Sequence, residues 1–255
     1  MIPKIIHYCW LSNDSYPEDF KRCIDTWKEK LPDYEFILWN FERFDIKSSL
    51  WVKQAFENKK YAFAADYIRL YAIYNYGGIY MDMDIEVLKP FDDILDSPIM
   101  IAYENDEKTG IEAGCFGAEK GDELIEKCLS YYENRSFIKD DGSFDDLPLP
   151  KIIINFINKN SNLQIYTSDY FTCKSYKTGI ITTTKKSYAI HHFAGSWTST
   201  AQKRYDKQRQ YLLTHFAVLG KILLIIPFCV WQISDNGIKG FLRKSVRKIR
   251  KEYLL

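Results

Sequence analysis

Residues 61–84 read YAFAADYIRLYAIYNYGGIYMDMD, a helical pattern that runs into two glycines and then into an extended, acidic stretch. The helical part belongs to a longer pattern over residues 51–75, which contains no proline and is expected to stop at Gly77-Gly78. Beyond the glycines, apolar residues alternate with aspartates, which indicates a buried strand that ends in polar side chains. This succession of helix, glycine turn and strand predicts the central unit of an α/β fold.

The flanking segments extend this unit in both directions. Upstream, we expect a strand at 4–10, a helix at 17–30 and a strand at 34–39, the order in which a nucleotide-binding α/β half begins. Downstream we expect a strand at 98–103, helices at 121–133 and 151–159, a loop at 137–149, and a strand leading into a glycine loop at 188–197. The sequence therefore predicts one main α/β domain, residues 1–200, and a helical appendage, residues 201–255.

The composition indicates a folded protein of a reducing compartment. Hydrophobic residues make up 46% of the 255 residues, enough to bury one sizeable core. The six cysteines lie far apart and no secretory signal pattern opens the sequence, so we expect a cytoplasmic location. The net charge of +1 is unevenly spread, because residues 239–252 hold seven Lys and Arg against one Glu.

Two aspartates, Asp82 and Asp84, are the strongest candidates for chemistry. In an extended segment alternate side chains point the same way, so both carboxylates and Tyr80 are expected on one face. Paired carboxylates with no basic neighbour in the sequence attract a divalent cation, and oxygen ligands suit Mn²⁺ or Mg²⁺, which also bind diphosphate. The alternative is a pair of solvated surface aspartates, which the apolar flanks disfavour.

Two further pairs complete the candidate site. Asp66 and Arg69 are three residues apart on the predicted helix, where Asp66 would accept hydrogen bonds from sugar hydroxyls and Arg69 would offer a planar fork to hydroxyl or phosphate oxygens. An ordinary surface ion pair is the alternative. His191 and His192 adjoin the glycine loop and are a source of a third metal ligand, since neutral imidazole binds Mn²⁺.

Three ordered motifs resemble glycosyltransferase family 32, which is related to the glycosyltransferase domains of large clostridial toxins and to family 8 galactosyltransferases. They are IPKIIHYCW at 2–10, AADYIRLYAIYNYGGIYMDMD at 64–84 and HHFAGSW at 191–197. The resemblance implies a GT-A fold, a Rossmann-like α/β/α sandwich with a mixed central sheet. It also implies metal-dependent transfer of a hexose from a nucleotide-sugar to a glycan or lipid-linked oligosaccharide, with retention of configuration.

The resemblance further implies a role for each motif residue. Asp66 and Arg69 would hold the donor sugar, and Asp82 would contact the ribose and the sugar, directly or through the metal. Asp84 and His192 would ligate the metal. The other contacts are to the base, the nucleoside and the diphosphate of the donor, and they are implied for Trp10, Asn40, Tyr80, Ser196 and Trp197.

The sequence indicates the sugar donor more specifically than the acceptor. We expect a UDP-sugar donor, because Trp10 and the HHFAGSW loop resemble those of UDP-using relatives. On the acceptor side, Glu112-Ala113-Gly114 stands where relatives are expected to carry an asparagine; an acceptor in capsule or surface-polysaccharide synthesis is expected. The competing functions are a metal-dependent nucleotidyltransferase or phosphohydrolase and a non-enzymatic metal- or carbohydrate-binding module, although no GxxxxGK, HExxH or EF-hand pattern occurs.

The C-terminal segment has two features of membrane-associated helices. Residues 216–233 are apolar, but Lys221 and Pro227 argue against a spanning helix. Beyond them, one apolar stripe lies beside the basic residues and comprises Ile238, Leu242, Val246, Ile249 and Tyr253. We therefore expect peripheral attachment to an anionic inner membrane surface and no nucleic-acid partner. The alternatives are a core or oligomer-contact helix, and a solvated or nucleic-acid-binding face; a homo-oligomer stays open.

Overall fold

The computed structural model describes residues 1–157, 163–195, 198–216 and 223–253. The chain forms two compact units. The first comprises Met1–Lys174 and Ile181–Phe193, and the second comprises Ser175–Ile180 and Ala194–Leu255. The predicted boundary at residue 200 falls at the first residue of helix α6 (Thr200–His215).

A mixed five-stranded sheet forms the centre of the first unit, in the order β2-β1-β3-β6-β5. Strands β2, β1 and β3 are parallel, whereas β6 is antiparallel to both β3 and β5. The bounds of the strands are Ile5–Cys9 (β1), Glu35–Trp39 (β2), Gly78–Met81 (β3), Ile99–Met100 (β5) and Cys115–Ala118 (β6). A separate antiparallel pair joins β4 (Ile85–Val87) to β7 (Ala189–His191). The predicted α/β class with a mixed sheet is confirmed.

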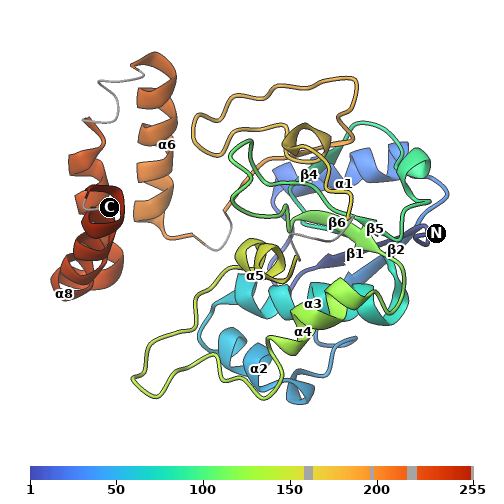
Figure 1. Ribbon diagram of the computed structural model, residues 1–255, viewed down its shortest axis with the longest axis horizontal. Coiled ribbons are helices and arrows are strands. Elements are labelled where there is room, and N and C mark those ends of the chain that lie inside the picture. Colours follow the sequence, from blue (N-terminus) through green and yellow to red (C-terminus); the bar gives the residue numbers. More distant parts are fainter. Residues whose placement is uncertain (158–162, 196–197, 217–222, 254–255) are drawn as a thin grey trace. The chain divides into compact units, whose positions relative to one another are not determined.

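Helices cover both faces of the sheet (Figure 1). Helix α1 (Glu18–Lys30) packs on one face, and helices on the other face comprise α2 (Leu50–Glu57), α3 (Tyr61–Tyr76), α4 (Glu123–Ser130) and α5 (Leu149–Phe156). Strand β3 shows why there are two cores: Ile79 and Met81 belong to the core on the α1 side, and Tyr80 belongs to the core on the α3 side. Successive strand side chains point to opposite faces, so the result is an α/β/α sandwich.

The single helix predicted over residues 51–75 is in fact two helices. Helix α2 ends at Glu57 and α3 starts at Tyr61, with Lys59 in the left-handed region at φ 57°. The Lys60 N–H donates to the Ala55 carbonyl, which closes the end of α2. The prediction was wrong here because no proline marks the break in the sequence. The helix ends through the conformation of Lys59 and the hydrogen bond from Lys60 to Ala55.

The turn between α3 and β3 requires both of its glycines. Gly77 and Gly78 have φ of 68° and 104°, a region that costs little only for glycine. A Cβ on Gly77 would lie 2.8 Å from the Lys120 nitrogen, and one on Gly78 would lie 2.7 Å from the Ile5 carbonyl oxygen. The glycines therefore let α3 run directly into the strand that ends at the aspartates.

His7 of β1 ties this turn to the sheet. Its Nδ1 accepts a hydrogen bond from Trp39 Nε1 at 3.0 Å, so its Nε2 carries the proton and donates to the Gly77 carbonyl at 2.8 Å. The imidazole is fully buried, and this burial lowers its pKa to about 4. Protonation of Nδ1 would break the bond from Trp39 and place a charge in the core.

Among its described residues, the second unit includes helices α6 and α8 (Ile225–Tyr253) and the segment Ser175–Ile180. This segment lies on α6, because Arg209 Nη2 donates to the Tyr176 carbonyl at 2.8 Å. Helix α8 has a kink at Gly237, where φ is 65° and ψ is 171°. The predicted helical appendage is therefore observed, and within the described ranges no helix is both long and apolar enough to cross a membrane. Part of the apolar run at 216–233, residues 217–222, lies outside the described residues.

We predict that His7 makes the protein less stable as the pH falls from about 6.5 to about 4. The folded-state pKa lies below the unfolded value, so the unfolded chain binds more protons in this window and unfolding is favoured. The loss is about 3 kcal/mol at most. Chemical denaturation of the wild type and His7→Gln at several pH values should show a shallower dependence in the variant. His215→Gln, at an exposed position, is the control; equal slopes for wild type and His7→Gln would contradict the assignment.

Candidate active site

The candidate site lies where three parallel strands end at the same edge of the sheet. Trp10 follows β1, Asn40 follows β2 and Asp82 follows β3. Since β2, β1 and β3 are parallel and adjacent, these residues meet at one edge. The carboxyl ends of such strands are the usual place for ligand binding in open α/β sheets.

Asp82 and Asp84 lie on a turn and not on one strand, contrary to the prediction. Strand β3 ends at Met81, and the Ile85 N–H donates to the Asp82 carbonyl at 3.0 Å, which closes the turn into β4. The Asp82 N–H is itself held by the Gly114 carbonyl at 2.7 Å. The two carboxylates are therefore brought together by a turn between two different sheets, and strand alternation does not explain their approach.

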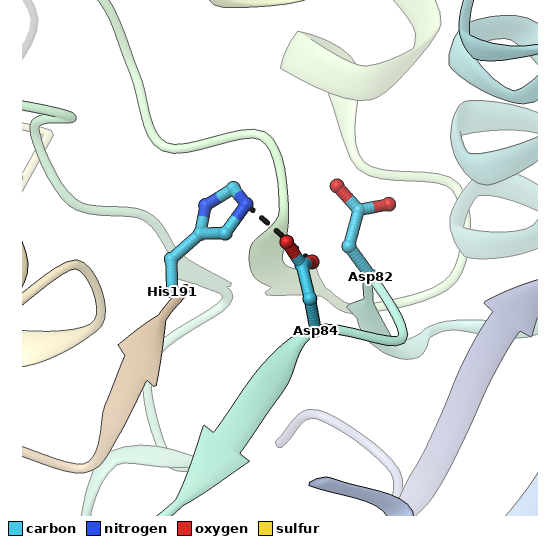
Figure 2. Close-up of side chains that lie close together, drawn as sticks. All are labelled: Asp82, Asp84 and His191. Carbon is cyan, nitrogen blue, oxygen red and sulfur yellow. Dashed lines mark ion pairs between the residues drawn. The ribbon is translucent and has the colours of Figure 1, made fainter. Parts of the chain in front are cut away.

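Asp82, Asp84 and His191 form a group that could hold a metal ion, as Figure 2 shows. One ligand atom from each residue lies within 4.8 Å of the others, and His191 Nε2 lies 3.6 Å from Asp84 Oδ1. The side chains of Asp84 and His191 are 11% and 12% exposed, whereas Asp82 is 30% exposed. Two carboxylates and an imidazole fit a divalent ion such as Mn²⁺.

The histidine beside the aspartates is His191, whereas His192 was the predicted ligand. His191 is the last residue of β7 and His192 follows the strand, and the two side chains have different partners. His192 Nε2 contacts Glu86 Oε2 at 2.8 Å, and only its backbone N–H reaches Asp84, at the carbonyl oxygen, at 3.1 Å. In this structure the pairing of β7 with β4 selects which histidine faces the carboxylates.

Glu112 binds the Nδ1 side of the His191 ring and is only 1% exposed. His191 Nδ1 lies 3.0 and 3.1 Å from the two Glu112 oxygens, and that carboxylate also accepts bonds from the Gly114 N–H at 2.6 Å and the Thr172 hydroxyl at 2.9 Å. With Nδ1 engaged, Nε2 is the nitrogen directed at Asp84. A metal-binding histidine commonly has such a carboxylate on its other nitrogen.

His191 and Glu112 each stabilise the charged form of the other. Burial by itself would lower the pKa of His191, but the carboxylates of Glu112 and Asp84 outweigh it and raise that pKa to about 10. Burial would likewise raise the pKa of Glu112, yet the charge and hydrogen bonds of His191 lower it. The sequence indicated Glu112 only as a departure from relatives, and its partners lie too far along the chain for any local pattern to find them.

Gly114 leaves room for the site. A Cβ at this position would lie 2.7 Å from His191 Cε1, 2.9 Å from Glu112 Oε1 and 3.0 Å from Asp82 Oδ2. Any side chain here would displace a proposed metal ligand or the carboxylate behind it. The glycine of the Glu112-Ala113-Gly114 segment is therefore required by the close approach of three functional groups.

Arg69 is the central cation of the site, and its guanidinium contacts two carboxylates and two backbone carbonyls. Its Nη1 donates to the Ala113 carbonyl at 2.6 Å and approaches Asp82 Oδ2 at 3.5 Å, while its Nη2 lies 3.3 Å from Asp82 Oδ1 and 3.4 Å from Asp66 Oδ1. The Nε–H points to the Ala65 carbonyl at 3.4 Å. The Nε and Nη1 groups thus donate hydrogen bonds, and Nη2 forms ion pairs with both aspartates. These contacts position Asp82, and contact of Arg69 with hydroxyl or phosphate oxygens of a substrate stays a prediction.

Tyr80 and Asp66 support this arrangement from within the protein. The Tyr80 ring, 1% exposed, lies 4.5 Å beneath the Arg69 guanidinium, and its hydroxyl donates to Asp82 at 2.9 Å. Tyr80 was predicted to contact the nucleotide-sugar donor, which stays a prediction. In this structure its hydroxyl group binds Asp82. Burial raises the pKa of Asp66 to about 6, although Arg69 and the N–H of Leu149, at the start of α5, oppose this rise.

Lys174 is a cation of the site that sequence reasoning missed. Its Nζ donates to the His192 carbonyl at 2.6 Å, and burial lowers its pKa although the charge of Asp84 opposes this shift. An isolated lysine in a loop carries no recognisable motif. The fold brings it beside the aspartate turn, where it could meet a phosphate group.

The nucleotide-contact residues lie at the rim of the site or outside the described residues. Trp10 is partly buried, with Nε1 donating to the Asp14 carbonyl at 3.0 Å and its ring edge-on to Tyr16 at 5.3 Å. Asn40 Oδ1 accepts the Glu42 and Arg43 N–H groups at 3.1 and 3.2 Å, so it shapes its own turn. Ser196 and Trp197 lie outside the described residues. Contact of any of them with a nucleotide stays a prediction.

Residues 17–100, which include α1, α3 and the aspartate turn, match the family model described as "Glycosyltransferase sugar-binding region containing DXD motif". This part of the chain is thus similar to the sugar-binding region of DXD-containing glycosyltransferases. The resemblance drawn from the three motifs is confirmed, and the mixed α/β sheet is consistent with a GT-A fold.

Similar proteins are found among fungal transferases. The chain is 34% identical over 128 residues to inositol phosphoceramide mannosyltransferase 3 of Schizosaccharomyces pombe, covering 47% of this chain and 34% of that protein. It is 36% identical over 109 residues to mannosyl phosphorylinositol ceramide synthase SUR1 of Saccharomyces cerevisiae, covering 40% and 27%. The chain thus spans about a third of the length of these relatives. A solved structure, PaToxG glycosyltransferase, superposes with a TM-score of 0.47 at 23% identity over 61% of this chain and 68% of that one.

The two neighbouring histidines allow a matched test of the metal group. His191→Gln should weaken Mn²⁺ binding about tenfold or more, because it removes the nitrogen that faces Asp84, whereas His192→Gln should change it little. Isothermal titration with Mn²⁺, alongside thermal melts, measures both effects. Stronger loss in His192→Gln than in His191→Gln would show that the loop rearranges on metal binding and that the observed pairing is not the binding geometry.

Glu112→Gln should lower Mn²⁺ affinity about 10- to 100-fold, because the neutral amide no longer holds His191 as a charged carboxylate does. The electron paramagnetic resonance signal of free Mn²⁺ reports the affinity directly. Glu123→Gln makes the same change at a highly exposed position and should bind Mn²⁺ like the wild type. Unchanged affinity in a folded Glu112→Gln protein would exclude a positioning role for this carboxylate.

Proposed function

We propose that this protein is a metal-dependent hexosyltransferase that moves a sugar from a nucleotide-sugar donor to a glycan or lipid-linked acceptor. The observation that carries the proposal is the Asp82, Asp84 and His191 group at the carboxyl edge of the parallel strands, inside the region that matches DXD-containing glycosyltransferases. A divalent ion, Mn²⁺ or Mg²⁺, would be held by these three residues. When bound, it supplies positive charge to the leaving diphosphate.

The residues of the site have distinct tasks in this proposal. The reaction breaks the bond between the anomeric carbon and a diphosphate oxygen and forms a bond to an acceptor oxygen, whose proton is released. Negative charge grows on the diphosphate, and Lys174 lies where its ammonium group could offset part of that charge. Arg69 and Tyr80 keep Asp82 in place throughout, because both bind its carboxylate. Since such preorganised groups need no rearrangement during the reaction, they lower its barrier.

The donor in this proposal is a UDP-sugar, because Trp10 and the HHFAGSW loop at 191–197 resemble those of UDP-using relatives, and the family resemblance favours transfer with retention. The relatives named as mannosyltransferases support a hexose and make mannose the second candidate sugar, for which GDP-mannose is the usual activated form. Those names also refer to inositol phosphoceramide, a lipid, which supports an acceptor carried on a lipid. A lipid-linked precursor of a capsule or surface polysaccharide is the acceptor that we propose.

We predict that the purified protein releases nucleoside diphosphate from one member of a panel of UDP- and GDP-sugars in the presence of Mn²⁺. A chelator should abolish the release, and added Mn²⁺ should restore it. Asp84→Asn should lower turnover about 100-fold or more, because a charged ligand of the ion is lost.

The matched control for this experiment is Asp140→Asn, which makes the same change at an exposed loop position. It should keep wild-type turnover. No release from any nucleotide-sugar, with or without candidate lipid acceptors, would count against a transferase; full activity of Asp84→Asn would count against the metal group.

A further inference from the structure

The first half of α8 has one face that packs on its own unit. The rings of Trp231 and Phe228 lie 4.9 and 5.9 Å from the ring of Tyr205 on α6. Gln232, on the same side of the helix, is 6% exposed. Helix α6 therefore already covers this face of α8.

The opposite face of α8 is apolar and exposed. Ile225, Ile226, Val230 and Ile233 are 60%, 75%, 61% and 41% exposed. At 100° per residue these four positions fall in one sector of about 140°, facing away from Trp231 and Phe228. Scattered apolar side chains on a surface are ordinary, but a row of four branched ones on a single helix face indicates a binding surface.

Beyond the kink at Gly237, the same helix continues with exposed apolar residues and then becomes strongly basic. Ile238 and Leu242 are 66% and 55% exposed. In the sequence, residues 239–252 contain seven Lys and Arg and one Glu, a local charge of +6 in a chain whose net charge is +1. Apolar and cationic residues thus succeed one another along α8, on the two sides of its kink.

We infer that α8 lies in the surface of an anionic membrane, with the face that comprises Ile225, Ile226, Val230 and Ile233 inserted among the lipids. Branched apolar side chains gain free energy by leaving water, and cations are attracted to anionic headgroups; the two contributions together make stable peripheral binding. A second copy of the chain is disfavoured as the occupant, because it would bring an identical cluster of positive charge. Nucleic acid would use the cations but leave the isoleucines in water.

This inference does not rest on the proposed transferase activity, since α8 belongs to the second unit and its binding needs no turnover. It adds a consequence for that activity. An enzyme held at a membrane surface meets a lipid-linked acceptor at a much higher local concentration than a freely diffusing one.

The test is flotation of the full-length protein with vesicles of phosphatidylcholine alone and of phosphatidylcholine with phosphatidylglycerol. The wild type should float with the anionic vesicles at low salt and should not float with the neutral vesicles. Ile226→Gln with Val230→Gln should lower partitioning about tenfold or more, because both side chains lose their transfer from water to lipid. Arg243→Glu with Lys244→Glu should lower it in anionic vesicles by a similar factor.

A matched control removes exposed isoleucines elsewhere. Ile180→Gln with Ile181→Gln alters side chains that are 50% and 46% exposed and should float like the wild type. Wild-type protein that stays unbound at low salt would overturn the inference, as would equal binding of the Ile226→Gln, Val230→Gln protein. Light scattering of the same samples would reveal a dimer lost in that variant without vesicle binding, which would assign the face to a second copy.

Discussion

Mutual repulsion among buried carboxylates is the constraint on which the site depends. Four carboxylates meet at one edge of the sheet: Asp66, Asp84 and Glu112 are buried, and the side chain of Asp82 is 30% exposed. Like charges in such surroundings are costly unless cations and hydrogen bonds compensate them. Arg69 and His191 supply that compensation, each between two carboxylates. The backbone of β3, β4 and β7 is arranged so that both cations reach their partners.

The two cations compensate in different ways. Arg69 stays charged and binds both Asp82 and the Ala113 carbonyl, so it sets their positions without changing during a reaction. His191 can release its proton and offer Nε2 as a ligand, since Glu112 keeps its other nitrogen bound. A divalent ion at this group would take the place of the His191 proton, while Glu112 would keep the imidazole oriented.

The second unit combines exposed apolar side chains with a run of basic residues. Helix α8 places aromatic rings against α6 and leaves branched apolar side chains in water. That exposure is unfavourable in isolation, and the basic run that follows suggests which partner removes it. The two units therefore contribute different halves of one proposed function: one binds and activates a sugar donor, and the other keeps the protein near a lipid-borne acceptor.

The sequence alone determined the features that depend on local pattern. The order of strand, helix and strand, the stop at Gly77-Gly78 and the acidic end of β3 follow from periodicity and from glycine, whose requirements are local. Only the tertiary structure decided which groups meet. The left-handed conformation of Lys59 divides the predicted helix into two. Arg69 forms an ion pair with Asp82, and Glu112 forms one with His191 of the β4–β7 pair. The choice of His191 over His192 depends on the pairing of β7 with β4, a contact between residues about a hundred positions apart. A shift of one residue along a strand reverses the face of every side chain, so only the observed register could set it.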